Sequence, residues 1–302
     1  MRRVSEPRST WGSLSGLERG RLHVAKALHV KPEHSGALAL RGRVEELAAE
    51  KARAVAAGVN SVGMEMVRIR AGSFEMGPPS SELNRGKAER RHRVRLKRDY
   101  LLSSTEVTQG QWQAVMGEKP SRFKGEDLPV ESVSWIEAVE FCNKLSERER
   151  LTPAYRISGK RVDWDRSSSG YRLPTESEWE YGCRAGSSTR FWSGDSDSGL
   201  GRAGWYSSNS GGRPHPVGGM AANPLGLFDV HGNVWEWCWD IYSRYPSGSA
   251  TDPSGPSKGA YRVERGGSWS SRAQFCRSAS RARSDPGLRY DNLGLRPARS
   301  TP

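Results

Sequence analysis

Three short helices, separated by long irregular stretches, most constrain what this chain can fold into. Each helix begins with a capping box, in which Ser or Thr is followed three residues later by Glu or Gln. These are Thr108 with Gln111, Ser134 with Glu137, and Thr175 with Glu178. Stretches rich in Gly, Ser, Pro and Asp follow at 146–170, 186–222 and 243–260. Loops this long are usually functional or held by special contacts, so the pattern predicts a domain of short elements and packed loops.

Eleven tryptophans offset the low hydrophobic fraction of 35%, because each large ring can bury roughly 150–250 Å². The segment GNVWEWCWD alternates as a strand does. Trp235, Trp237 and Trp239 would face one side, and Val234 and Glu236 the other. Three indoles on one face predict a wall of the hydrophobic core.

The formal net charge of +13 raises the question of a nucleic-acid partner. The basic residues are mostly arginines scattered along the chain, and the one dense block is ERRHRVRLKR at 89–98. Arginine also stacks on aromatic rings and binds carboxylates. We therefore favour an arginine-rich scaffold over a nucleic-acid-binding protein.

The cysteine pattern and the absence of long apolar runs limit the compartment. None of the four cysteines forms a CxxC pair, which argues against a structural zinc site. No apolar run reaches the roughly 18 residues that a membrane span needs, and the first residues lack the apolar core of a signal peptide. The sequence predicts a cytoplasmic protein with reduced thiols and no membrane contact.

The N-terminal part differs in character from the rest. Residues 1–13 are predicted to be disordered, and 14–58 to form a helical hairpin that resembles the end of a tetratricopeptide repeat. One repeat cannot bury its own apolar face, so this hairpin is either an adaptor for a partner protein or a plain linker. After Gly63, alternation within 64–77 predicts a strand as far as Ala71, followed by a Gly turn.

Six stretches carry a resemblance to a known family, in that family's order. They are VRIRAGSFEMG (67–77), SSTEVTQGQWQAVMG (103–117), DLPVESVSWIEAVEFCNKLSE (127–147), GYRLPTESEWEYGCRAG (170–186), NPLGLFDVHGNVWEWCWD (223–240) and RVERGGSW (262–269). The family they resemble is the formylglycine-generating enzyme (sulfatase-modifying factor) superfamily. The resemblance implies that 62–300 form an α+β, loop-rich domain related to the C-type lectin fold, here preceded by the short helical hairpin.

The resemblance also implies two metals, calcium and copper(I). The residues at the corresponding positions favour the binding of neither. The family binds calcium near the Trp-rich strand, where Asn233, Glu236 and Asp240 could supply oxygen ligands; a role in the core is the favoured alternative. The name-giving oxidases hold copper(I) with two cysteines five residues apart. Here those positions are Ser271 and Cys276. Because a hydroxyl cannot replace a thiolate as a copper(I) ligand, we expect no copper and no oxidase activity.

No other catalytic set replaces the copper pair. The six histidines are dispersed, and His231 is interpreted as a packed loop residue. Cys276 is interpreted as a small buried residue. Cys276 and Ser268 would be catalytic only under the alternative that this chain is an oxidase of protein cysteine.

The C-terminal segment 266–296 shows a second resemblance, carried by GGSWSSRAQFCRSASRARSDPGLRYDNLGLRPA. It resembles the variable proteins of diversity-generating retroelements, in which adenine-directed mutagenesis turns Asn codons into codons of the form NNY. Such codons cannot encode Lys, Gln, Glu, Met or Trp. The positions that alternate with fixed blocks all satisfy this rule: Ser270, Ser271, Arg272, Phe275, Ser280, Ala282, Ser284, Leu288, Tyr290 and Asn292.

This second resemblance gives the chain's arginines and apolar residues distinct roles. Phe275, Leu288 and Tyr290 would be apolar anchors for a ligand, and Arg272 a charged one. The neighbouring arginines would be scaffold that stacks on Trp or pairs with carboxylates; the alternative is a solvated basic face. These are Arg277, Arg281, Arg283, Arg289 and Arg296.

The favoured function is therefore a non-catalytic, variable ligand-binding protein that contacts a protein or other macromolecule through 269–292. One alternative is a formylglycine-generating-type oxidase. Another is a sensor or accessory domain of a signalling or defence system.

Overall fold

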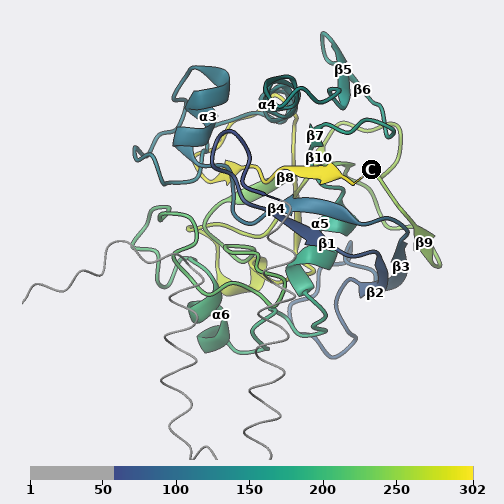
Figure 1. Cartoon of the computed structure of the whole chain (residues 1–302). Helices are drawn as coiled ribbons and strands as arrows, with labels where there is room; N and C mark the ends of the chain where they lie inside the picture. Colours follow the sequence, from purple (N-terminus) through teal and green to yellow (C-terminus); the bar gives the residue numbers. More distant parts are fainter. Residues whose placement is uncertain (1–57, 302) are drawn as a thin grey trace, which may run out of the picture. The chain divides into compact units, whose positions relative to one another are not determined.

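The computed structural model describes residues 58–301, which form a loop-rich α+β domain. The predicted disordered segment 1–13 and all of the predicted hairpin 14–58 except Gly58 lie outside these residues. Figure 1 shows the helices on both sides of short strands, with α3 and α4 above them and α6 below. The helices are α3 (Gln109–Met116), α4 (Trp135–Arg148), α5 (Glu176–Arg184) and α6 (Asp197–Ala203), with a 3-10 turn, η1, at Ala273–Phe275.

The strands form three small sheets and one hairpin. The first sheet has the order β1 (Met66–Ile69), β4 (Tyr100–Ser103), β13 (Ala298–Ser300), β7 (Tyr171–Arg172). The second has the order β11 (Arg281–Ser284), β10 (Arg262–Arg265), β8 (Trp235–Ile241), β12 (Leu293–Gly294). The third consists of β2 (Gly72–Met76), β3 (His92–Leu96) and β9 (Ala250–Thr251), and the hairpin of β5 (Tyr155–Ser158) and β6 (Arg161–Trp164).

All three predicted capping boxes are formed. The hydroxyls of Thr108, Ser134 and Thr175 each accept a hydrogen bond from the backbone N–H three residues later. In each case the Gln or Glu side chain at that third position also accepts one from the backbone N–H of the cap. Reciprocal capping satisfies donors that a helix start would otherwise leave free, so these helix starts are set locally.

The predicted tryptophan wall is confirmed, and β8 proves to be buried on both faces. Trp235 and Trp237 pack into a core with α4, while Trp239 is partly buried against it. On the opposite face, Cys238 joins a second core with Trp179 of α5. The sheet of β8 therefore separates two cores.

The strand predicted at the start of 64–77 is shorter than expected. It ends at Ile69, and the expected Gly turn is instead the start of β2 at Gly72. The two strands join different sheets, β1 pairing with β4 and β2 with β3. The apolar positions change phase at the break, from Val67 and Ile69 to Phe74 and Met76, so the sequence indicates an interruption but not that a second strand begins at Gly72.

The last strand, β13, lies inside the first sheet rather than at its edge. Ala298 is in register with Leu102 of β4 on one side and with Arg172 of β7 on the other. The segment 266–296 is thus bounded by β10 before it and by β13 after it. Within residues 58–301, no helix combines the length and apolar character needed to cross a membrane.

Candidate ligand-binding face

We define the display segment as residues 266–296. Its first part is a loop with two successive turns, at 268–271 and 272–275. The N–H of Ser271 donates to the carbonyl of Ser268 at 2.9 Å, and that of Phe275 to the carbonyl of Arg272 at 2.9 Å. These backbone bonds need no particular side chains, and Ser270, Arg272 and Phe275 are exposed. The loop can therefore exchange these side chains without losing its own bonds.

The second part, 285–292, is held against the start of α4 by its backbone. The N–H of Trp135 donates to the carbonyl of Pro286 at 3.1 Å, and that of Ser132 to the carbonyl of Tyr290 at 2.9 Å. The two parts meet where the side chain of Asn292 donates to the hydroxyl of Ser270 at 3.2 Å. Positions 22 residues apart in sequence thus form one surface.

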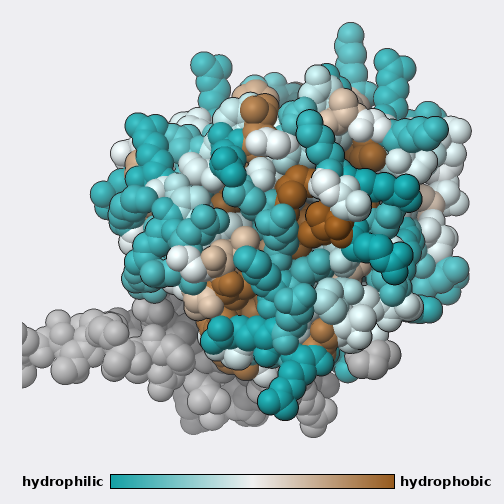
Figure 2. Space-filling view, turned by 90° about the horizontal axis from the view of Figure 1, so that it is seen from above, coloured by the Kyte–Doolittle hydropathy of each residue, from teal (hydrophilic) through white to brown (hydrophobic). Residues whose placement is uncertain are grey.

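Three of the ten predicted display residues are among the few large apolar side chains exposed in residues 58–301. Phe275, Leu288 and Tyr290 are 46%, 45% and 43% exposed. The others are Val59, Leu83 and Tyr261. Figure 2 shows one face on which hydrophilic side chains dominate and apolar surface is confined to small patches. Exposed apolar side chains that gather in one segment are typical of binding sites.

The other display positions differ in exposure. Ser271, Ala282, Ser284 and Asn292 are half-buried. Ser280 is only 3% exposed, because it leads into β11 beside the inner strand β10. It therefore does not contribute to an exposed face, which leaves nine of the ten positions.

The arginines between the display positions are scaffold, as predicted. Arg277, Arg281 and Arg296 have almost fully buried side chains, and they pair with Glu82 and Glu89, with Glu176, and with Glu236 respectively. Arg289 pairs with Glu137 at the surface. Arg283 stacks on two tyrosines, not on a tryptophan. The alternative of a solvated basic face is therefore wrong for the buried Arg277, Arg281 and Arg296, whereas Arg283 and Arg289 are exposed.

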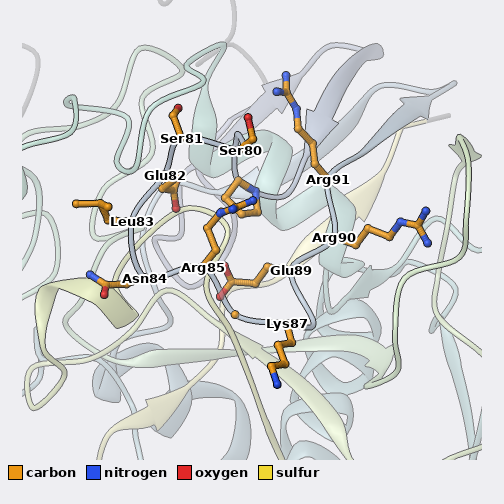
Figure 3. Close-up of a pocket in the computed structure, with 12 residues that line it drawn as sticks. Ser80, Ser81, Glu82, Leu83, Asn84, Arg85, Lys87, Glu89, Arg90 and Arg91 are labelled. Carbon is orange, nitrogen blue, oxygen red and sulfur yellow. The ribbon is translucent and has the colours of Figure 1, made fainter.

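Arg277 fixes a loop that the sequence shows only as polar. Its guanidinium binds the carboxylates of Glu82 and Glu89, and its Nε donates to the carbonyl of Gln274 at 2.7 Å. Figure 3 shows Glu82 and Glu89 turned into the loop, while Leu83 and Arg90 point away from it. The loop lines an open depression of about 890 Å³. The sequence around Glu82 and Glu89 does not indicate this contact, because their partner Arg277 lies far away in the chain.

Cys276 has the surroundings of a core residue. Its thiol is fully buried with Phe191, Leu200 and Tyr206, and burial raises its pKa to about 12. The hydroxyl of Ser271 accepts from the N–H of Ser268 at 3.0 Å. A buried, protonated thiol and a hydroxyl do not fit a copper(I) site, which needs thiolates.

We expect native protein to resist alkylation at Cys276. Because burial holds the thiol protonated, iodoacetamide at about pH 8 should leave all four buried cysteines unmodified. Peptide mass spectrometry measures this directly. The same protein unfolded in guanidinium chloride should be modified at all four, and selective modification of native Cys276 would contradict the burial described here.

Asn233 and Glu236, the two candidate calcium ligands, both have partners inside the protein. Both carboxylate oxygens of Glu236 accept from the guanidinium of Arg296, at 2.8–3.1 Å, and one also accepts from the indole of Trp179 at 2.7 Å. The side-chain oxygen of Asn233 accepts from the N–H of His215 at 2.9 Å. An internal cation thus already neutralises the charge that calcium would need.

Two further groups have structural partners. Asp240 accepts from the N–H of Glu176 at 2.8 Å, and burial raises its pKa to about 8. His231 is buried, as interpreted from sequence: it accepts from the N–H of Trp192 and its other nitrogen lies 2.8 Å from the carbonyl oxygen of Cys276. No group of three or more metal-ligating His, Cys, Asp or Glu side chains occurs in residues 58–301.

Comparison with known proteins agrees with this fold. Residues 51–301 match the sulfatase-modifying factor enzyme 1-like domain. A solved structure, Treponema denticola variable protein 1, is similar with a TM-score of 0.74 and 36% identity, over 81% of this chain and 98% of that one. The structure of PvdO from Pseudomonas aeruginosa is similar with a TM-score of 0.68 and 27% identity, over 80% and 96%.

Two curated proteins are also similar in sequence. The chaperone protein LppX of Paenibacillus barcinonensis is 32% identical over 80% of this chain and 92% of its own length. The formylglycine-generating enzyme of Mus musculus is 31% identical over 61% of this chain and 48% of its own length. The chain thus spans about half of that enzyme.

Proposed function

Because the chain belongs to the family of sulfatase-modifying factor enzyme 1-like domains, we propose that it uses the family's scaffold as a non-catalytic binding protein. Its ligand would be a protein or other macromolecule that contacts the exposed positions of 269–292. The observation that carries this proposal is the exposure of Phe275, Leu288 and Tyr290 on a segment whose fixed arginines are bound internally.

Binding side chains and folding side chains occupy alternate positions in this segment. Arg277 and Arg281 bind carboxylates in the interior, whereas the backbone of the display loops is held by main-chain hydrogen bonds. A rigid scaffold with exchangeable exposed positions is the arrangement by which variable binding proteins change specificity. The likeness to Treponema denticola variable protein 1 supports the same assignment.

We further propose that a diversity-generating retroelement varies the display positions. All nine exposed or half-exposed display residues can be encoded by NNY codons, whereas Trp269 and Gln274, which cannot, occupy fixed positions. Sequencing the gene's surroundings tests this part. It requires a reverse transcriptase gene and a second copy of the segment with adenines at these codons; their absence would refute it.

We expect the nine display positions to tolerate simultaneous replacement. Randomising them with NNY codons in a phage-displayed library should leave most clones folded, because these side chains form few interior contacts. Selection against an immobilised protein such as streptavidin should then recover binders. Protease resistance of the clones measures folding, and enrichment measures binding.

A matched library supplies the control. It randomises buried arginines of the same segment, Arg277, Arg281 and Arg296, and should yield almost no folded clones. Equal loss of folding in both libraries, or no binders from a folded display library, would overturn the proposed function.

The alternative, oxidation of a protein cysteine, conflicts with Ser271 and with the protonated thiol of Cys276. Incubation of the chain with a CxPxR peptide, copper and oxygen should leave the peptide mass unchanged. Formation of formylglycine would establish the oxidase instead.

A further inference from the structure

Glu264 lies at the centre of the display segment's sheet and has no counter-charge among residues 58–301. It stands on β10 opposite Ala282 of β11 and opposite Trp237 of β8. Directly opposed residues of adjacent strands have their side chains about 4.5–5.5 Å apart on one face. The residue is 6% exposed, so its carboxylate lies just beneath the display positions.

The partners of Glu264 set it apart from other carboxylates of this region. Glu82, Glu176 and Glu236 each bind an arginine of the display segment. The carboxyl of Glu264 is influenced only by burial and by the hydroxyl of Ser284. Its Oε1 is buried and accepts no hydrogen bond from residues 58–301. A buried carboxylate oxygen without a donor is costly, and a binding role is one explanation for such an atom.

The residues that cover Glu264 are small and are display positions. Ala282 opposes it directly, and Ser284 lies two residues along β11, on the same face of the strand as Ala282. A larger side chain at 282 would lie over the carboxylate. Glutamate itself cannot be encoded by an NNY codon, so an acid of this reach has to come from a fixed position.

We propose that Glu264 is a fixed anchor of the ligand-binding face and accepts a guanidinium group of the ligand between Ala282 and Ser284. This proposal rests on the proposed function and specifies a chemical class for its ligand, an arginine-bearing protein surface. Guanidinium fits better than ammonium, because it is more weakly hydrated and donates two parallel bonds to a carboxylate. The side chains at 282 and 284 then decide whether the anchor is open or covered.

The test uses a small probe, so it does not depend on knowing the natural ligand. N-acetyl-arginine methylamide is titrated into the full chain at about pH 8, and backbone amide shifts are followed by NMR. The neutral citrulline analogue is the matched probe. Saturable shifts at Glu264, Ala282 and Ser284 with the arginine probe alone are expected.

Three variants complete the experiment. E264Q should weaken binding of the arginine probe at least tenfold by removing the charge. A282F should do the same by covering an intact carboxylate, whereas D285N, which neutralises an exposed acid of the same segment, should bind as the wild type does. If E264Q or A282F binds the arginine probe as tightly as the wild type, Glu264 is not an anchor for a guanidinium group. Either result would leave the library experiment untouched, so the two proposals can fail separately.

Discussion

Replacing Arg296 by Met is expected to lower the free energy of unfolding by about 3–5 kcal/mol. Arg296 and Glu236 are both fully buried. The guanidinium also donates to the carbonyls of Ser103 and Phe228. Methionine fills similar space but supplies no charge, so the Glu236 carboxylate remains desolvated with only the indole of Trp179 as a donor.

Urea denaturation at neutral pH measures this loss. The control is Arg289→Met, which breaks an exposed pair with Glu137 and should cost less than about 1 kcal/mol. The double variant R296M/E236Q should recover part of the loss, because it removes the unpaired charge. Equal stability of R296M and R289M would contradict the scaffold role of the buried pair.

The second large effect has the opposite sign: E264Q should be more stable than the wild type at about pH 8. Burial raises the pKa of Glu264 from 4.5 to about 7 in the folded protein. The folded state therefore favours the protonated form, and its stability falls as the pH rises from about 4.5 through 7. This shift corresponds to roughly 3 kcal/mol, a penalty that the neutral glutamine does not incur.

Thermal or urea unfolding of both proteins across this pH range tests the sign. The two curves should nearly coincide at about pH 4, diverge between about 4.5 and 7, and run parallel above. D285N, at an exposed site, should show no such divergence. If E264Q destabilises the protein at high pH, the carboxylate has a partner inside the protein. It would then not be available to bind a ligand. A gain in stability on losing a charged residue is typical of functional sites.

Features that depend on neighbours in sequence could be predicted. The capping boxes at Thr108, Ser134 and Thr175 use atoms three residues apart, so their residue types suffice. The alternation of Trp235, Trp237 and Trp239 similarly indicates the core wall. Ser271 also shows from sequence that the cysteine pair is incomplete, because a copper(I) ligand needs a sulfur donor whatever the fold.

Features that depend on distant partners could not be predicted. Arg277 meets Glu82 and Glu89 across about 190 residues of chain, and no local pattern joins them. The internal partner of Glu236 could not be predicted for the same reason, since it is Arg296, 60 residues away. Ser280 satisfies the codon rule, yet it is buried just before β11. Codon rules describe which residues can occur, whereas exposure depends on packing.

The position of β13 has a consequence for biosynthesis. During translation, β4 and β7 emerge long before the strand that lies between them, and β13 follows the display segment. A frameshift or premature stop among the display codons would remove β13 and leave the first sheet with an unfilled gap. The domain would then fail to close and would be open to proteolysis. The fold thus couples completion of its stable structure to a correctly read display segment, so that only in-frame products would accumulate.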